Sequence, residues 1–256
     1  MTRGGEARLG NGFSRVPAAR PQTMSDQNTD PSRLLLAHLP IIIINFKTYE
    51  EATGDRALRL ARICRSVAMK YGKRIIISPQ FTDIYRIAKE ASPYTPVFAQ
   101  HIDDGIGKFT GSVSPLAVKE AGAVGTLLNH SERPLSTVEV GKRVAAAKAH
   151  GLMTLVFADS IRQSVKIEAF APDMIAYEPP ELVGTGISVS TAKPSQVTDF
   201  VKKVKPTVRR LVGAGISNAG DVRKAIELGA DGWGVSSAFT KAKDPERILT
   251  ELVEAS

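Results

Sequence analysis

The sequence predicts an α/β fold, a compact (β/α)8 barrel. From residue 40 onward, short apolar runs alternate with amphipathic stretches of about 10 to 20 residues, the rhythm of repeated βα units. Turn residues bound the apolar runs, which is typical of strands that are buried on both faces. A doubly wound open sheet is the runner-up interpretation, because the same alternation fits it.

Eight apolar runs are the predicted strands. They lie at residues 41–46, 74–78, 96–99, 124–128, 154–158, 174–177, 210–213 and 232–236. Eight strands that alternate with helices fit the lower end of the size range of a (β/α)8 barrel.

Helical spacing fills most of the intervals between these runs. Apolar residues recur every three to four positions across 57–68 and across 138–148. Asn218 precedes a third such segment as a predicted N-cap, and Asp244 with Pro245 predicts the start of the last helix. The segments after the third and fifth strands are short, so we expect abbreviated helices there.

Composition bounds the class of protein. The chain has 256 residues and 27.5 kDa, with 43% apolar and 23% charged residues, which is ordinary globular usage and excludes collagen, coiled coil and wholesale disorder. The longest purely apolar run, 41–44, is far short of the roughly 20 residues that cross a bilayer. Cys64 is the only cysteine, which excludes an internal disulfide and a cysteine-based zinc site and favours the reducing cytoplasm.

The first 38 residues differ from the rest. They are rich in glycine, proline and arginine and show no helical or strand period, so we predict a flexible, disordered extension at 1–38 and a catalytic barrel domain at 39–256. The extension has no apolar segment typical of a secretory signal, whereas an arginine-rich transit peptide stays open. Met24 is an alternative initiator.

The net charge of +8 suits an anionic ligand, either a phosphate or a nucleic acid. No run of five like charges occurs, and no basic stripe is interleaved with aromatic residues. A solvated surface is therefore the favoured interpretation, and nucleic-acid binding is a distant alternative.

Three ionisable residues follow predicted strands by one or two positions. Lys47, His130 and Glu178 come at the ends of the first, fourth and sixth strands, which in a barrel meet at one mouth. Each alone has an ordinary interpretation, such as a surface lysine or a structural histidine. Together they predict one pocket with a cation, an imidazole and a desolvated carboxylate that can act as a general base.

Local sequence around His130 predicts a second feature. Ser131 fits the cap of a short helix whose first turn holds Pro134. The positive end of that helix would disfavour the imidazolium form of His130.

Two loops in the last quarter predict an anion site. Gly215 and Ser217 follow the seventh strand, and Ser236 and Ser237 follow the eighth. Barrel enzymes commonly bind a substrate phosphate there through backbone N–H groups, and glycine permits close approach. The ordinary alternative is that Gly215 serves only a tight turn.

A candidate lid follows Glu178 directly. Prolines stiffen one end of the segment and glycines loosen the other, which suits a segment that swings over a site. Its residues are Pro179, Pro180, Glu181, Leu182, Val183, Gly184, Thr185 and Gly186.

These motifs resemble the triosephosphate isomerase family and, in their compactness, its archaeal branch. Asn45-Phe46-Lys47 is similar to the family's first-strand motif, and Asn129-His130-Ser131-Glu132 to its electrophile motif. Ala176-Tyr177-Glu178-Pro179 with Gly184-Thr185-Gly186 is similar to its base-and-lid signature. The resemblance spans roughly residues 40–253 in the family's order and implies a TIM barrel.

The resemblance implies a role for each matching residue. Glu178 would shuttle a proton between two carbons of the triose, neutral His130 would polarise the carbonyl, and Lys47 would stabilise the enediolate and the phosphate. Asn45 would hydrogen-bond near the same oxygen, and Glu132 would hold Lys47 in place. The implied phosphate contacts are Gly184, Ser217, Ser236 and Ser237.

The resemblance further implies glycolytic and gluconeogenic activity without a metal or cofactor. It also implies a homo-oligomer, a dimer or a tetramer, in which Thr110 reaches the neighbouring subunit from a long loop after the third strand. A plain surface loop is the alternative for that segment. Ser236-Ser237 replaces the family's usual glycine pair, and the first 38 residues have no counterpart in the family.

Three rival functions remain open at this point. A catalytically silent barrel could bind sugar phosphates for regulation, but it would be expected to lack Lys47, His130 or Glu178, and all three are present. A different phosphate-binding barrel enzyme, as in tryptophan or histidine biosynthesis, would not be expected to share both the electrophile motif and the lid signature. Nucleic-acid binding is the third.

Overall fold

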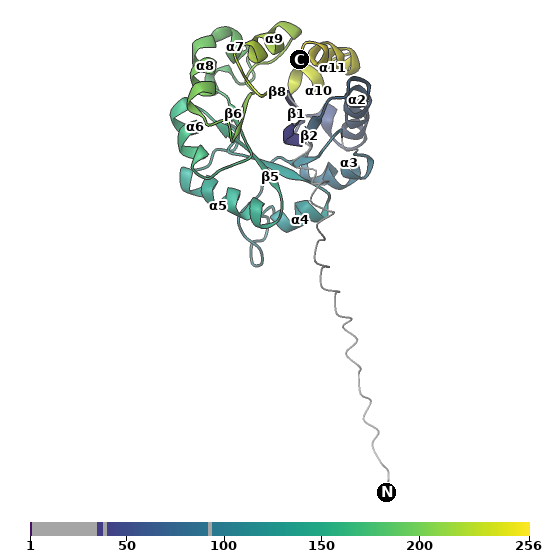
Figure 1. Cartoon of the computed structure of the whole chain (residues 1–256). Coiled ribbons are helices and arrows are strands. Elements are labelled where there is room, and N and C mark those ends of the chain that lie inside the picture. Colours follow the sequence, from purple (N-terminus) through teal and green to yellow (C-terminus); the bar gives the residue numbers. More distant parts are fainter. Residues whose placement is uncertain (2–34, 38–39, 92–93) are drawn as a thin grey trace. The chain divides into compact units, whose positions relative to one another are not determined.

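A computed structural model describes Met1 and residues 35–37, 40–91 and 94–256 of the chain. Within these residues, eight parallel strands form a closed ring with helices around its outside (Figure 1), which confirms the predicted (β/α)8 barrel and excludes the doubly wound sheet. The strands are β1 Ile41–Asn45, β2 Ile75–Ser78, β3 Phe98–Ala99, β4 Gly125–Leu128, β5 Met153–Ala158, β6 Met174–Tyr177, β7 Arg209–Val212 and β8 Gly232–Val235.

Strand pairing follows the chain around the ring. The order is β2-β1-β8-β7-β6-β5-β4-β3, and a parallel bridge between Ile77 and Val97 joins the two ends of this order. In β1 the register sets Ile43 beside Ile76 of β2 and Gly234 of β8. Because every strand runs the same way, all eight carboxyl ends open on one face.

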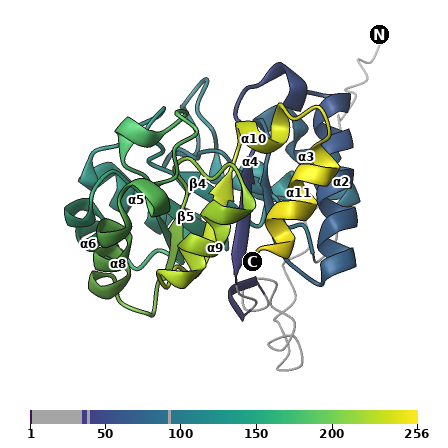
Figure 2. The same ribbon diagram turned by 90° about the horizontal axis from the view of Figure 1, so that it is seen from above.

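The helices lie outside the strands (Figure 2). Those described are α2 Asp55–Tyr71, α3 Ile84–Glu90, α4 Pro115–Glu120, α5 Thr137–Ala149, α6 Ile161–Glu168, α7 Val189–Ala192, α8 Pro194–Lys203, α9 Ala219–Glu227, α10 Ser237–Thr240 and α11 Pro245–Glu254, with single 3-10 turns at η2 Glu50–Ala52, η3 Phe81–Asp83 and η4 Pro180–Leu182. The helices after β3 and β5, α4 and α6, are short as predicted.

Local sequence explains where the later helices begin. The Asn218 side chain accepts a hydrogen bond from the Asp221 backbone N–H. The Asp221 carboxylate accepts one from the Asn218 backbone N–H, and the two bonds form a capping box for α9. Asp244 caps α11, and Pro245 occupies its first position. Both predicted caps are confirmed.

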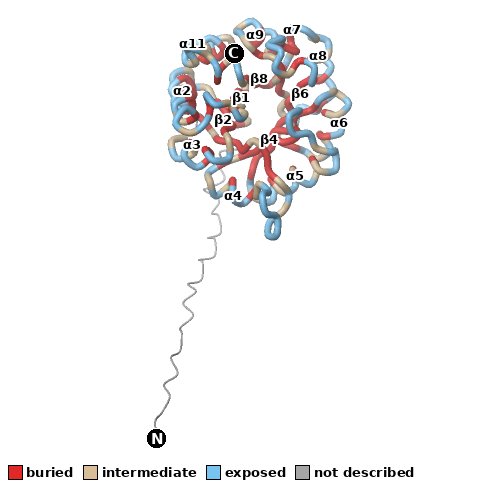
Figure 3. The backbone as a smooth tube through the Cα atoms, turned by 180° about the vertical axis from the view of Figure 1, so that it is seen from behind, coloured by how far each residue is buried: buried red, intermediate tan, exposed pale blue. Residues whose placement is uncertain are grey.

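The core has two layers, because successive strand residues point to opposite sides of the ring. In β1, Ile41 and Ile43 belong to the apolar cluster inside the barrel, whereas Ile42 and Ile44 belong to the cluster between strands and helices. The strands are therefore buried on both faces (Figure 3), as their continuous apolar runs predict.

Packed residues begin earlier than the predicted boundary at residue 39. Leu35 is 1% exposed and belongs to the apolar cluster inside the barrel. The carbonyl of Leu36 accepts a hydrogen bond of 2.8 Å from Nη2 of Arg209, the first residue of β7. The other residues of the predicted extension, including Met24 and excepting Met1 and Ala37, lie outside the described residues, so the domain boundary remains a prediction for them.

Among the described residues, no helix combines the length and the apolar character needed to cross a lipid bilayer.

Candidate active site

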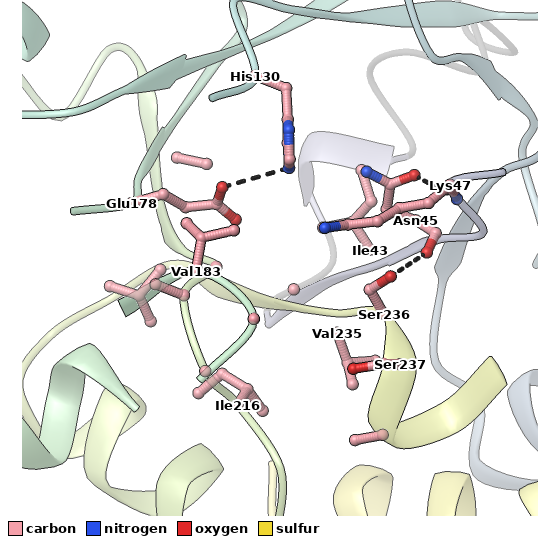
Figure 4. Close-up of a pocket in the computed structure, with 18 of the residues that line it drawn as sticks. Ile43, Asn45, Lys47, His130, Glu178, Val183, Ile216, Val235, Ser236 and Ser237 are labelled. Atoms are coloured by element: carbon pink, nitrogen blue, oxygen red, sulfur yellow. Dashed lines mark hydrogen bonds and ion pairs between the residues drawn. The ribbon is translucent and has the colours of Figure 1, made fainter. Parts of the chain in front are cut away.

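A cavity of about 330 Å³ opens at the carboxyl ends of the strands (Figure 4). Its walls come from the ends of β1, β4, β6, β7 and β8 and from the segment after Glu178. The predicted site residues that line it are Asn45, Lys47, His130, Glu178, Val183, Gly184, Gly186, Gly215, Ser217, Ser236 and Ser237.

Lys47 has a left-handed backbone, with φ of 48°, which non-glycine residues seldom adopt. The Lys47 N–H donates to Oδ1 of Asn45 at 2.9 Å, and Nε2 of Gln100 donates to the Lys47 carbonyl at 2.8 Å. Nζ of Lys47 lies 2.6 Å from Oε1 of Glu132, and the Lys47 side chain is 13% exposed. These contacts hold the ammonium group at the wall of the cavity.

His130 is neutral and presents a proton to the cavity. Burial lowers the pKa of His130 to about 4, with a further decrease from Lys47, while Glu132 opposes both effects. The Glu132 backbone N–H donates to Nδ1 of His130 at 3.2 Å, so Nδ1 accepts and the ring proton lies on Nε2. The imidazole is therefore a neutral hydrogen-bond donor.

The predicted short helix after His130 is wrong. Residues 131–133 form a turn, in which Arg133 N–H donates to the His130 carbonyl at 2.8 Å, and α5 begins only after its cap at Ser136. Pro134 is followed at once by the Leu135 N–H, which binds Asn129 rather than a helical carbonyl. The low pKa of His130 comes from burial instead of a helix terminus.

Glu178 is a buried carboxylate directly after β6. Burial raises its pKa to about 7, against an opposing effect of Lys47. A Cβ at Gly213 would lie 2.1 Å from Oε1 of Glu178, so only glycine at the end of β7 leaves room for the carboxylate. Such a carboxylate titrates near neutral pH, which suits a general base.

Glu178 and His130 lie next to each other in the wall of the cavity, and their polar tips point toward each other (Figure 4). Oε2 of Glu178 is buried and has no hydrogen-bond partner among the described residues, and Nε2 of His130 lies 3.5 Å from it. A carboxylate oxygen that is free to accept a proton and a neighbouring N–H that is free to donate a hydrogen bond can act on two adjacent atoms of one small molecule. The arrangement can remove a proton while it stabilises the oxyanion that forms.

The loop after β7 approaches the segment after Glu178 closely. Gly215 has φ of 73°, and a Cβ there would lie 1.9 Å from the Ile187 carbonyl oxygen. The N–H and Oγ of Ser217 both donate to Oδ2 of Asp221, each at 3.0 Å. Glycine at 215 therefore serves two purposes: it adopts the positive φ of the turn, and it leaves room for the Ile187 carbonyl.

On the other side of the cavity, Oγ of Ser236 donates to the Asn45 carbonyl at 2.7 Å (Figure 4). The hydroxyl therefore does not cap the short helix α10, which begins at Ser237. This bond ties the end of β8 to the end of β1.

The predicted lid forms η4 followed by two glycines. Gly184 and Gly186 have φ of 77° and 75°, which glycine adopts without strain. Glu181 pairs with Lys193, and Oγ of Ser217 lies 3.4 Å from the Gly186 carbonyl oxygen. The segment thus contacts the protein at both ends.

Several predicted residues lie outside the lining of this cavity. Glu132 acts on Lys47 from behind, and Thr110 is exposed on the loop after β3. The remaining ones belong to the lid segment: Pro179, Pro180, Glu181, Leu182 and Thr185.

Sequence reasoning missed four residues that shape the site. Gly213 makes room for Glu178, Gln100 holds Lys47, and the Phe157 ring packs edge-on against His130 with centroids 4.8 Å apart. The fourth, Asp221 on α9, accepts hydrogen bonds from the N–H and Oγ of Ser217. Gly213 ends the seventh predicted strand, and this position is the one usable signal among the four, because glycine permits close approach.

No cluster of three or more metal-ligating side chains occurs among the residues that the structure describes.

Comparison with known proteins gives a consistent result. The family model described as "Triosephosphate isomerase" matches residues 40–163 and 156–255. Curated proteins named triosephosphate isomerase are 43% identical over 219 residues in Methanosarcina barkeri (84% of this chain, 98% of that protein) and 46% identical over 218 residues in Methanobacterium bryantii (84% and 96%). A third, from Saccharolobus solfataricus, is 41% identical over 220 residues (85% and 96%).

A solved structure shows the same fold. The crystal structure of triosephosphate isomerase from Bartonella henselae aligns with a TM-score of 0.66 at 20% identity, over 85% of this chain and 99% of that one.

Proposed function

The chain belongs to the triosephosphate isomerase family, and its curated relatives are mostly archaeal, as the motifs predict; on this premise we propose that Glu178, His130 and Lys47 carry out the family's reaction. The reaction is the interconversion of D-glyceraldehyde 3-phosphate and dihydroxyacetone phosphate, a step of glycolysis and gluconeogenesis. A proton moves between adjacent carbons while an enediolate forms between them.

The proposed roles follow from the protonation states at the site. Glu178 removes the proton from one carbon and returns it to the next, which one carboxylate can do if both carbons lie within its reach. Nε2–H of His130 donates to the carbonyl oxygen as negative charge develops there, and the Lys47 ammonium adds positive charge to the same region. Asn45 lies beside Lys47 and donates near that oxygen.

The observation that carries the proposal is a close pair of groups. Oε2 of Glu178 is buried and accepts no hydrogen bond among the described residues, and Nε2 of neutral His130 lies 3.5 Å from it. Burial raises the pKa of Glu178 toward neutrality and lowers that of His130, so a carboxylate more basic than an ordinary one and an uncharged donor coexist in one cavity. A binding protein without catalysis would not need a buried carboxylate that lacks a partner, since such a group costs stability.

We propose that the substrate phosphate binds between the loops after β7 and β8. Gly215, Ser217, Ser236 and Ser237 line that side of the cavity, and Gly184 brings the lid to it. The proposed lid, 179–186, closes over the bound triose and excludes water, because an exposed enediolate phosphate would lose its phosphate group.

We also propose a cytoplasmic homo-oligomer, dimer or tetramer, in which Thr110 contacts the neighbouring subunit. Thr110 is exposed on the loop 103–113, and the adjacent Phe109 leaves 55% of its surface in solvent. Sedimentation of the purified chain over a range of concentrations tests the assembly, and cell fractionation tests the compartment.

A coupled assay of glyceraldehyde 3-phosphate conversion tests the function, with Glu178→Gln as the decisive variant. We expect a loss of about 10²- to 10⁴-fold in kcat, since the amide cannot accept the proton, while affinity for a phosphate ligand changes by a few fold at most. Glu227→Gln, at an exposed acid on α9, is the matched control and should keep full activity. Wild-type turnover by Glu178→Gln would contradict the assignment.

A further inference from the structure

Asn129 occupies the position between β4 and His130. Its φ is 58°, in the left-handed region that asparagine tolerates better than most side chains do. This backbone turn sets the direction in which the His130 side chain leaves the end of the strand.

The Asn129 side chain is 7% exposed and uses both of its polar atoms. Nδ2 donates to the Phe157 carbonyl at 2.8 Å, and Oδ1 accepts from the Leu135 N–H at 2.8 Å. One amide therefore joins the end of β4, the end of β5 and the far end of the turn that follows His130.

The segments that Asn129 joins both contact the His130 ring. The Phe157 ring forms the edge-on wall of the imidazole, with an interplanar angle of 79°. The residues between His130 and Leu135 include Glu132, whose N–H holds Nδ1. Asn129 itself does not line the 330 Å³ cavity but another one of about 280 Å³, which shares Phe157 and Glu178 with it.

We propose that Asn129 is a positioning residue that sets the orientation and the tautomer of His130, an inference that rests on the proposed role of His130 as the electrophile. Glycine could supply the left-handed backbone but not the side-chain hydrogen bonds to Phe157, Gln163 and Leu135. A neutral amide also differs from a carboxylate at this place, since a negative charge next to His130 would favour the imidazolium form.

Asn129→Gly, Asn129→Ala and Asn129→Asp test this assignment in the full chain. Glycine keeps the backbone conformation and removes only the side-chain bonds, so we expect kcat to fall about 10- to 100-fold with KM within threefold. Alanine should fall at least as far, because it also disfavours the left-handed backbone. The carboxylate that Asn129→Asp introduces would favour the imidazolium form, so His130 should titrate at a higher pH in this variant than in wild type when its nitrogen-15 resonances are followed.

Thr126→Val is the matched control for a general weakening of β4. Thr126 is buried in the same strand, and its hydroxyl donates to the Leu127 carbonyl, away from His130. Its kcat should equal that of wild type. An equal loss of kcat in Thr126→Val and Asn129→Gly would overturn the proposal, as would wild-type kcat in both Asn129→Gly and Asn129→Ala.

A spectroscopic measurement separates this inference from the proposed function. Nitrogen-15 NMR of the imidazole, assigned with His130→Gln, reports the tautomer without any substrate. We expect protonated Nε2 in wild type and in Thr126→Val, and mixed tautomers in Asn129→Gly. An unchanged His130 spectrum in all Asn129 variants would overturn the positioning role even if the isomerase assay succeeds, whereas an inactive wild type with the expected spectra would contradict only the proposed function.

Discussion

The carboxylate of Glu178 shows how burial decides chemistry at a single residue. The side chain would ionise near pH 4.5 in water, and burial at the end of β6 raises its pKa to about 7. Gly213 leaves the space for the carboxylate in this position, since a Cβ there would lie 2.1 Å from Oε1 and would force the Glu178 side chain to shift. The proposed base therefore depends on two strands: β6 positions Glu178, and the glycine after β7 leaves room for its carboxylate.

The raised pKa of Glu178 predicts an acid limb in kcat/KM near pH 7, since only the carboxylate form accepts a proton. His130, with a pKa of about 4, should add no limb above pH 5. Rates are to be expressed per substrate dianion, because a phosphate monoester itself titrates near pH 6. A flat profile between pH 5 and 8 would show that Glu178 ionises as in water.

The same shift predicts a stability difference with a definite sign. Because the folded pKa of Glu178 is raised, its protonated form stabilises the fold fully below pH 4.5, and this contribution is lost as pH rises through 7. The difference in free energy of unfolding between Glu178→Gln and wild type should therefore shift in favour of the variant as pH rises from 5 to 8, by up to about 3 kcal/mol. Denaturant titrations at these pH values measure the difference.

Sequence alone could predict that Lys47, His130 and Glu178 line one cavity, because each follows an apolar run by one or two positions. It could not identify Gly213 or Gln100, whose roles depend on which strands are neighbours in the ring. Their contacts join residues 35 and 53 positions apart, at distances that no local pattern encodes.

At the scale of elements, strands and capped helices were predictable and turns were not. β6 has the predicted bounds, and Asn218 and Asp244 cap helices as expected, because these signals are local. The turn after His130 resembles a helix start in sequence. The buried amide of Asn129 binds the Leu135 N–H there instead, a tertiary contact that overrides the local preference.

The loop 103–113 is an element closed at its base by one residue. The N–H of Asp103 donates to the Val113 carbonyl at 2.9 Å, and Oδ2 of Asp103 accepts from the Val113 N–H at 2.8 Å. Oδ1 of Asp103 lies 3.3 Å from Nη2 of Arg143 on α5 and 3.2 Å from Nε2 of buried His101. The base of the loop is therefore anchored to the barrel.

This anchor predicts that Asp103→Ala weakens the proposed assembly. Without the carboxylate, the loop that carries Thr110 loses its fixed geometry, so its ordering would oppose association. We expect the dissociation constant between subunits to rise at least about tenfold in sedimentation experiments, a change of roughly 1.4 kcal/mol. Asp104→Ala, at the exposed neighbour, is the control, and equal assembly of both variants with wild type would contradict the role of the anchor.

At the scale of the whole barrel, the candidate active site lies at one end, and the segment before β1 contacts the other end. The carboxyl ends of the strands hold the candidate active site, whereas Leu35 and Leu36 contact the amino-terminal end, where Arg209 begins β7. The interior between them is filled by apolar side chains such as Ile43 and Leu155. The sequence did not predict this contact, because Leu35 lies within a segment whose composition indicates flexibility.

The contact of Leu35 predicts a separation between stability and activity. Leu35→Ala would leave a void against the interior cluster, so we expect the free energy of unfolding to fall by about 2 kcal/mol and Tm by roughly 5 °C. kcat/KM should match wild type, since the mutation lies at the end of the barrel away from Glu178. Leu116→Ala, at a leucine on α4 that is 46% exposed, is the control and should change Tm little. An unchanged Tm in Leu35→Ala would show that the segment before β1 does not stabilise the fold. A loss of kcat/KM would show that packing at the amino-terminal end of the barrel affects the site at the carboxyl end.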